Sequence, residues 1–133
     1  MKRILFIILM VFVIAFFPRG RNQEITAMPS VNFKRTGKAS WYSRRDPGVN
    51  RKTANNENFN DETMTCAMWG VAFDRKIKVT NLENGKSIIV RVNDRGPGER
   101  YVRKGRIIDL TKKAFNSLGH TKKGLIHVEV EFL

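Results

Sequence analysis

The stretch VRVNDRGP, residues 90–97, and the stretch GRIIDL, residues 105–110, together decide how this chain folds. Each is rich in β-branched residues, which is typical of a buried strand, and each leads to one aspartate, Asp94 or Asp109. The pair Gly96-Pro97 predicts a turn of the backbone directly after the first acid. The sequence therefore predicts two strands whose ends bring two carboxylates to one rim of a sheet.

Polar and cationic residues flank both acids. Asn93, Arg95 and Arg106 lie beside them in the sequence and could fix a carboxylate by hydrogen bonds and charge while leaving it open to a ligand. The same pattern also fits a purely structural role, in which Asp94 caps a turn and Asp109 precedes a helix. From the residues alone, both interpretations stay open.

Short strands separated by turns make up most of the chain after residue 37. Alternating or β-branched patterns predict strands over residues 37–43, 63–68, 76–80, 87–92 and 126–132. Asn84-Gly85 is a strong signal for a tight hairpin between the third and fourth of these. So many short strands favour a small β-barrel over a sandwich or an α/β sheet.

One short helix is predicted in this mainly β body, over residues 111–118 (TKKAFNSL). Thr111 is a favourable N-cap and Gly119 follows the last apolar residue as a stop signal. The apolar side chains of the segment fall on one helical face, which would pack on the barrel; they are Ala114, Phe115 and Leu118.

The N-terminus has the pattern of an export signal. Two cations, Lys2 and Arg3, precede an unbroken apolar run over residues 4–17. As a helix this run would be roughly 21 Å long, shorter than the roughly 30 Å hydrocarbon core of a bilayer. We therefore expect residues 1–21 to be a signal peptide or an uncleaved anchor, with a flexible linker over 22–36 and a folded domain over 37–133. No cysteine lies near the end of the run, so a lipoprotein is not expected.

The chain is strongly basic, with a formal net charge of +13 over 133 residues. Four of the cations lie in the first 21 residues, so the remainder carries 21 cations against 12 acids, or +9. Such a surface attracts nucleic acid, an anionic membrane face or an anionic wall polymer. Because the chain carries an export signal, we expect a wall polymer, no nucleic acid, and membrane contact only through the N-terminal segment.

Metal, cofactor and thiol chemistry have little support in the sequence. Cys66 is the only cysteine, so no intramolecular disulfide can form, and it is expected to act as a small core residue. With His120 and His127 it makes no zinc-ligand pattern, and no glycine-rich phosphate loop is present. We predict no metal and no cofactor.

Four motifs in this order resemble the double-psi β-barrel domain of the rare-lipoprotein-A-like (RlpA-like) proteins. They are GKASWY (37–42), TANNENF (53–59), KVTNLENGKSIIVRVNDRGP (78–97) and GRIIDLTKKAFNSLG (105–119). The resemblance covers the chain from about residue 37 to its end. It implies a six-stranded double-psi barrel, export to the bacterial cell envelope, and lytic transglycosylase activity that cleaves the MurNAc-GlcNAc bond of peptidoglycan glycan strands with a 1,6-anhydro product.

The resemblance also implies roles for three carboxylates. Asp94 is expected as the general acid/base, Glu57 of the TANNENF motif as its partner or stabiliser, and Asp109 as a third acid of the sugar groove. A lytic transglycosylase needs no activated water, because the C6 hydroxyl of the muramic acid attacks its own C1. Asn93, Arg95 and Arg106 would then contact substrate.

Other features leave the function open. Met68 stands where many relatives have a histidine, and residues 71–74 (VAFD) replace the usual Leu-Pro-Phe-Gly. A non-catalytic wall-binding barrel, or a polysaccharide-acting protein like the related expansins and endoglucanases, are therefore alternatives. Trp41, Tyr42 and Tyr101 could stack on sugar rings, although the first two could equally pack in the core. We expect a monomer, because a closed barrel has no free sheet edge.

Overall fold

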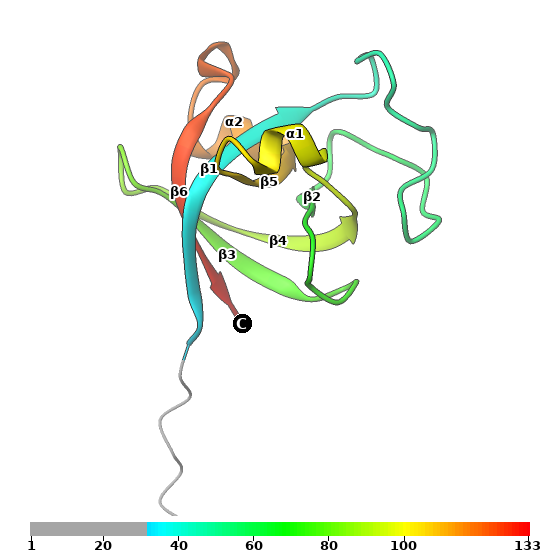
Figure 1. The fold of residues 1–133 in the computed structure, drawn as a ribbon. Coiled ribbons are helices and arrows are strands. Elements are labelled where there is room, and N and C mark those ends of the chain that lie inside the picture. The colour runs from blue at the N-terminus through cyan, green and yellow to red at the C-terminus, as the bar shows by residue number, and fades with distance from the viewer. Residues whose placement is uncertain (1–31) are drawn as a thin grey trace, which may run out of the picture.

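Six strands form a closed barrel in the computed structural model, which describes residues 32–133. The predicted export segment and most of the predicted linker lie outside the described residues. The strands are β1 (Lys34–Tyr42), β2 (Thr65–Ala67), β3 (Lys76–Asn81), β4 (Ser87–Asp94), β5 (Arg106–Thr111) and β6 (Ile126–Phe132). Figure 1 shows them curving around a common interior, with the long connection from β1 to β2 extending to one side.

The strand order around the barrel is β1-β5-β2-β4-β3-β6. Two neighbouring pairs, β1 with β5 and β2 with β4, run parallel, and all other pairs run antiparallel. The parallel partners are far apart in the sequence, so each pair needs a crossover connection. The predicted six-stranded double-psi barrel is confirmed, and its closure pairs every strand on both sides.

The predicted strands are all present; β6 has the predicted ends, and the ends of the others are shifted. β1 begins at Lys34, three residues before the predicted start of the folded domain, because residues 34–36 pair with Glu131, Val130 and Glu129 of β6. β2 is limited to Thr65–Ala67, and β4 continues to Asp94 itself. The hairpin at Asn84-Gly85 joins β3 to β4, with Gly85 at a φ of +76° that favours glycine.

The barrel interior is filled by the inward faces of the strands and closed by α2 (Lys112–Leu118). The three predicted apolar residues of α2 are fully buried, and the Oγ1 atom of Thr111 accepts a hydrogen bond from the Ala114 N–H at 3.4 Å. Truncation of the central Phe115 to alanine should cost about 3–5 kcal/mol. Cys66 is also fully buried, and this burial raises the pKa of its thiol, so it acts as a core residue.

Two short helical turns were not predicted. α1 (Glu99–Val102) lies in the connection between β4 and β5, and η1 (Thr121–Lys123) precedes β6. An ion pair between Arg103 and Glu99 spans α1. The prediction of a single helix therefore missed a one-turn helix that carries Tyr101 to the rim of the barrel. No helix within residues 32–133 has the length and apolar character needed to cross a bilayer.

Candidate active site

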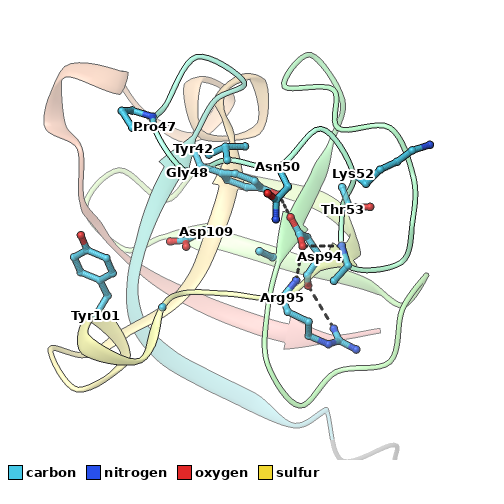
Figure 2. Close-up of a pocket in the computed structure, with 14 residues that line it drawn as sticks. Tyr42, Pro47, Gly48, Asn50, Lys52, Thr53, Asp94, Arg95, Tyr101 and Asp109 are labelled. Carbon is cyan, nitrogen blue, oxygen red and sulfur yellow. Dashed lines mark hydrogen bonds between the residues drawn. The ribbon is translucent and has the colours of Figure 1, made fainter.

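A large cavity opens at the rim where β4 ends (Figure 2). Its volume is about 570 Å³, which suits a small segment of a polymer. Three parts of the chain surround it: the connection after β1, the ends of β2 and β4 with the adjoining part of β5, and α1. The lining residues are Tyr42, Pro47, Gly48, Val49, Asn50, Lys52, Thr53, Ala54, Ala67, Asp94, Arg95, Gly98, Tyr101 and Asp109.

The register of three adjacent strands brings Asp94 and Asp109 to this cavity. Ala67 on β2 pairs with Asp94 on β4 and with Asp109 on β5. The two aspartates therefore flank Ala67, two strand spacings or about 10 Å apart along the sheet. The prediction that two carboxylates meet at one rim agrees with this register, although Asp109 lies within β5 and not at its end.

Asp94 is held by donors from three segments. Its Oδ1 atom accepts hydrogen bonds from the backbone N–H of Ala54 at 2.9 Å and of Arg95 at 2.8 Å. Its Oδ2 atom accepts a bond of 3.3 Å from the hydroxyl of Tyr42. Burial, followed by the charge of Asp94, raises the pKa of that phenol, so it stays protonated and continues to donate. The carboxylate is thus oriented on one side and open to the cavity.

Asp109 has a drier environment than an ordinary surface acid. Its side chain is 18% exposed, and burial raises the pKa of the carboxyl. A hydrogen bond from the Ser40 hydroxyl to Oδ1 and the Arg106 guanidinium at 3.7 Å oppose this shift without cancelling it. Gly96 leaves room for the group, since a Cβ there would lie 3.3 Å from Oδ2.

Glu57 occupies a different place from the two aspartates. It does not line the cavity, and it forms a two-point ion pair with Arg91, with distances of 2.6 and 2.9 Å. Asn93 and Asn55 donate further bonds of 3.0 and 2.8 Å to its carboxylate. These donors, Arg91 first, lower the pKa of Glu57 to about 2. The group is therefore ionised and occupied by protein donors at neutral pH.

The Glu57 network holds the loop that supports Asp94. Thr53 and Asn55 bind the neighbouring backbone through N–H bonds to Glu57 O at 2.9 Å and Asn93 O at 3.3 Å. Arg91 also pairs with the exposed Asp74 at 2.7 Å. We call Glu57, Arg91, Asn93 and Asn55 the Glu57 clasp. It fixes the loop from which the Ala54 N–H reaches Asp94.

Of the six residues expected to bind substrate, three line the cavity: Tyr42, Arg95 and Tyr101. Asn93 is buried and belongs to the Glu57 clasp. Arg106 lies behind the wall, with its guanidinium 4.2 Å from the centre of the Tyr101 ring. Trp41 packs against the core and donates its indole N–H to Thr121 O at 3.0 Å, away from the cavity lining.

Several site residues were missed by sequence reasoning. The segment 47–54, in which no residue was predicted to bind substrate, supplies seven of the residues that line the cavity. Ser40, the hydrogen-bond donor to Asp109, was read only as part of a strand. The role of the segment 47–54 could have been predicted, since a long polar loop beside a motif is a usual place for binding residues. Nothing in the sequence pointed to Ser40.

Met68, where the resemblance to the RlpA-like family implies a histidine, is fully buried in the core cluster. Its backbone remains close to the site, because its N–H donates to Asp94 O at 3.2 Å. Within residues 32–133, no three His, Cys, Asp or Glu side chains are grouped in a way that could hold a metal ion.

Comparisons with known proteins agree with this fold. Curated relatives include the probable endolytic peptidoglycan transglycosylase RlpA of Nostoc sp., 39% identical over 87% of this chain and 32% of its own length. The endolytic peptidoglycan transglycosylase RlpA of Rickettsia felis is 42% identical over 86% of this chain and 51% of its own length. The chain thus spans about a third to a half of these relatives.

Solved structures with a similar fold include a Streptomyces papain inhibitor, with a TM-score of 0.59, 22% identity, and coverage of 76% of this chain and 94% of that one. An expansin of Clavibacter michiganensis has a TM-score of 0.58 and 20% identity over 76% of this chain and 50% of its own. At these identities the likeness concerns the fold alone. The family model described as lytic transglycolase matches residues 34–130, most of the chain. This protein therefore belongs to the lytic transglycolase family of double-psi β-barrel proteins.

Proposed function

We propose that this protein is a peptidoglycan lytic transglycosylase whose reaction takes place between Asp94 and Asp109. The observation that carries the proposal is the placement of two carboxyl groups of unlike environment on either side of Ala67 in one cavity. Acid and base roles are commonly separated by environments of this kind. The names of the curated relatives support the same reaction class.

In this proposal Asp109 is the general acid. Because burial raises the pKa of its carboxyl, it keeps its proton to higher pH than an exposed aspartate. It would protonate the glycosidic oxygen as the bond between that oxygen and C1 of the muramic acid breaks. The nearby charge of Asp94 further favours the protonated form of Asp109 and would help to stabilise the cationic sugar.

Asp94 is the general base. Its contacts come from N–H and O–H donors that orient the carboxylate, and it accepts a bond from each of them. It would remove the proton of the C6 hydroxyl while that oxygen forms a bond to C1, giving the 1,6-anhydro ring. No water is consumed, and solvent exchange returns one proton to Asp109 and removes one from Asp94. This divides between two aspartates the acid/base role that the sequence assigned to Asp94 alone.

Glu57 acts in the proposal as a positioning residue. Its ion pair with Arg91 fixes the loop whose Ala54 N–H holds Asp94, and the low pKa of Glu57, about 2, removes it as a proton donor at neutral pH. The cavity-lining Arg95, Tyr42 and Tyr101 would contact the sugar rings.

The proposed substrate is the glycan strand of peptidoglycan in the bacterial envelope. The export pattern of residues 1–21 and the basic composition both suit a protein that works on an anionic wall. Cleavage of the signal, anchoring through it, and a monomeric barrel remain predictions of the sequence.

The test uses the full-length chain, purified in mild detergent, and isolated sacculi. Release of anhydro-muropeptides, measured by mass spectrometry, is expected from the wild type and should be lost in Asp94→Asn and Asp109→Asn. Glu83→Gln is a matched control, because Glu83 pairs with Lys123 on the surface away from the cavity. Undiminished product from either aspartate variant would contradict its assigned role.

A non-catalytic wall-binding barrel is the second candidate. The observation in its favour is Met68, a buried thioether in place of the histidine that the resemblance implies. It predicts that the wild type sediments with sacculi but releases no fragments under any condition tested. A third class, a hydrolase, would release fragments with ordinary reducing ends.

A further inference from the structure

A large aromatic side chain, Trp69, is exposed on the connection between β2 and β3. The side chains of nearby residues in the sequence point inward, since Met68 is fully buried and Val71 is 7% exposed. Gly70, with a φ of +73°, turns the chain between them. Trp69 is therefore left on the outside of a turn and is 52% exposed. A single exposed aromatic side chain is ordinary on a protein surface, so a role for Trp69 depends on how its ring is held and on what lies beside it.

The indole ring of Trp69 is held in one orientation. Its Nε1–H donates a hydrogen bond of 2.7 Å to the carbonyl oxygen of Pro97, in the turn that follows Asp94 and Arg95. The polar atom of the ring is thus satisfied by the protein, and the apolar face remains for contact with a ligand. A ring fixed in advance loses little conformational entropy on binding.

The surface continues from Trp69 to the cavity through Arg95. The Arg95 guanidinium lies 3.8 Å from the centre of the Phe73 ring, which is 36% exposed, and donates to Met68 O at 3.0 Å. Arg95 also lines the cavity that holds Asp94 (Figure 2). We call Trp69, Phe73 and Arg95 the Trp69 platform. Its link to the proposed reaction site is Arg95, because the indole of Trp69 binds the backbone two residues after Arg95 and Arg95 itself lines the cavity.

We propose that the Trp69 platform is a stacking subsite for a pyranose ring of the glycan strand, beyond the two sugars whose bond is cleaved. A pyranose presents an apolar face of C–H groups edged by hydroxyls, which suits a fixed aromatic face beside a guanidinium donor. The platform adjoins the cavity, and a polymer is the ligand that would extend from one to the other. This inference rests on the proposed function, because it assigns the same polymer to a neighbouring surface.

The chain has two tryptophans, which allows a direct test. In the full-length Trp41→Phe variant, Trp69 is the sole indole, and its fluorescence would be titrated with β-1,4-linked N-acetylglucosamine hexamer and dimer. Binding of the hexamer should shift or quench this signal. In Trp69→Ala, measured by calorimetry, the affinity for the hexamer should fall about tenfold, the effect of one lost stacking contact. The affinity for the dimer, which fills only the cavity, should not change.

Trp41→Phe also serves as the matched control in calorimetry, because Trp41 packs against the core away from the cavity lining. Its hexamer affinity should equal that of the wild type. Trp69→Phe keeps an aromatic face and should recover part of the loss, while thermal melting confirms that all variants fold. Equal hexamer affinities of the wild type and Trp69→Ala would overturn the inference. So would a loss of self-association in Trp69→Ala with no change in hexamer affinity, which would identify a second copy as the occupant.

The outcome for the proposed function is separate. If the wild type binds the hexamer through Trp69 but releases no anhydro product from sacculi, the subsite stands and the lytic transglycosylase proposal fails. If the wild type releases anhydro product and Trp69→Ala binds the hexamer as tightly as the wild type does, the lytic transglycosylase proposal stands and the subsite fails. A wild type that binds no hexamer overturns the subsite.

Discussion

The Glu57 clasp and the aspartate pair both include residues of β4, but their carboxylates have opposite environments. The Glu57 carboxylate accepts hydrogen bonds from Arg91 and two asparagines, and its pKa is lowered to about 2. Asp94 and Asp109 line an open cavity, and burial raises the pKa of Asp109. One region uses charge to hold a loop in place. The other leaves its acids free for a ligand.

This difference indicates how the barrel could keep a reactive centre ordered. The loop that donates the Ala54 N–H to Asp94 is tied to β4 through Arg91 and Glu57, so the clasp orients the base without entering the cavity. A catalytic group needs support of this kind to keep its geometry. Substitutions of the aspartates should therefore lower mainly the reaction rate, and substitutions in the Glu57 clasp should lower mainly the stability of the fold.

The largest effect is expected from the aspartates. Asp94→Asn and Asp109→Asn each remove a proton-transfer group and should lower the rate of anhydro-product formation at least about a hundredfold. Binding of glycan should change little, because the asparagine keeps the shape of the side chain. Initial rates on sacculi and sedimentation with sacculi measure the two quantities. Equal loss of binding and rate would mean that these acids hold substrate and do not transfer protons.

A smaller effect on rate, with a loss of stability, is expected for the clasp. Arg91→Ala leaves Glu57 without its main partner, and it should destabilise the fold by about 1–2 kcal/mol, because the pair is partly exposed. The rate should fall about tenfold through the displaced Asp94. Chemical denaturation measures the loss of stability, and initial rates on sacculi measure the fall in rate.

The matched control for this change is Asp74→Asn, which removes the charge of the other partner of Arg91. Asp74 lies at a φ of +68°, which asparagine tolerates, and its side chain is 72% exposed, so the change should leave stability and rate nearly unchanged. If Asp74→Asn and Arg91→Ala had the same effect, the ion pair with Glu57 would not be the contact that matters.

Tyr42→Phe should have a still smaller effect on the rate. It removes the hydroxyl that donates to Asp94 at 3.3 Å but keeps the ring stacked on Phe59, with centroids 4.7 Å apart. Two backbone donors still hold the Asp94 carboxylate. We expect a rate reduction of about two- to fivefold at unchanged melting temperature, since one long hydrogen bond is worth about 0.5–1 kcal/mol. A hundredfold reduction would make Tyr42 a proton donor in its own right.

The Glu57 clasp should also make the stability of the fold depend on pH in the acid range. The pKa of Glu57 is lowered from 4.5 to about 2, so its ion pair stabilises the fold fully above pH 4.5 and is lost as the pH falls towards 2. Glu57→Gln should therefore be less stable than the wild type at pH 6, and the difference should shrink below pH 4. Denaturation curves at several pH values measure it. A difference independent of pH would mean that Glu57 contributes by packing alone.

The fold was largely predictable, because strand patterns, the Asn84-Gly85 hairpin and the Thr111 cap are local signals. The site was predictable only in part. Asp94 and Asp109 stand out in their motifs, but the barrel register that places Ala67 between them is a long-range property. Glu57 could not be separated from them, since its state depends on Arg91, a strand residue 34 positions away. Trp41 and Trp69 are alike in sequence, and only the fold exposes one of them.

The most direct measurement is the mass of the muropeptides released from sacculi by the full-length chain in water enriched in oxygen-18. Attack by the C6 hydroxyl predicts anhydro-muramic ends that carry no label, and their loss in Asp94→Asn. New reducing ends in place of anhydro ends would show that water is the nucleophile, and they would contradict the division of roles between Asp94 and Asp109.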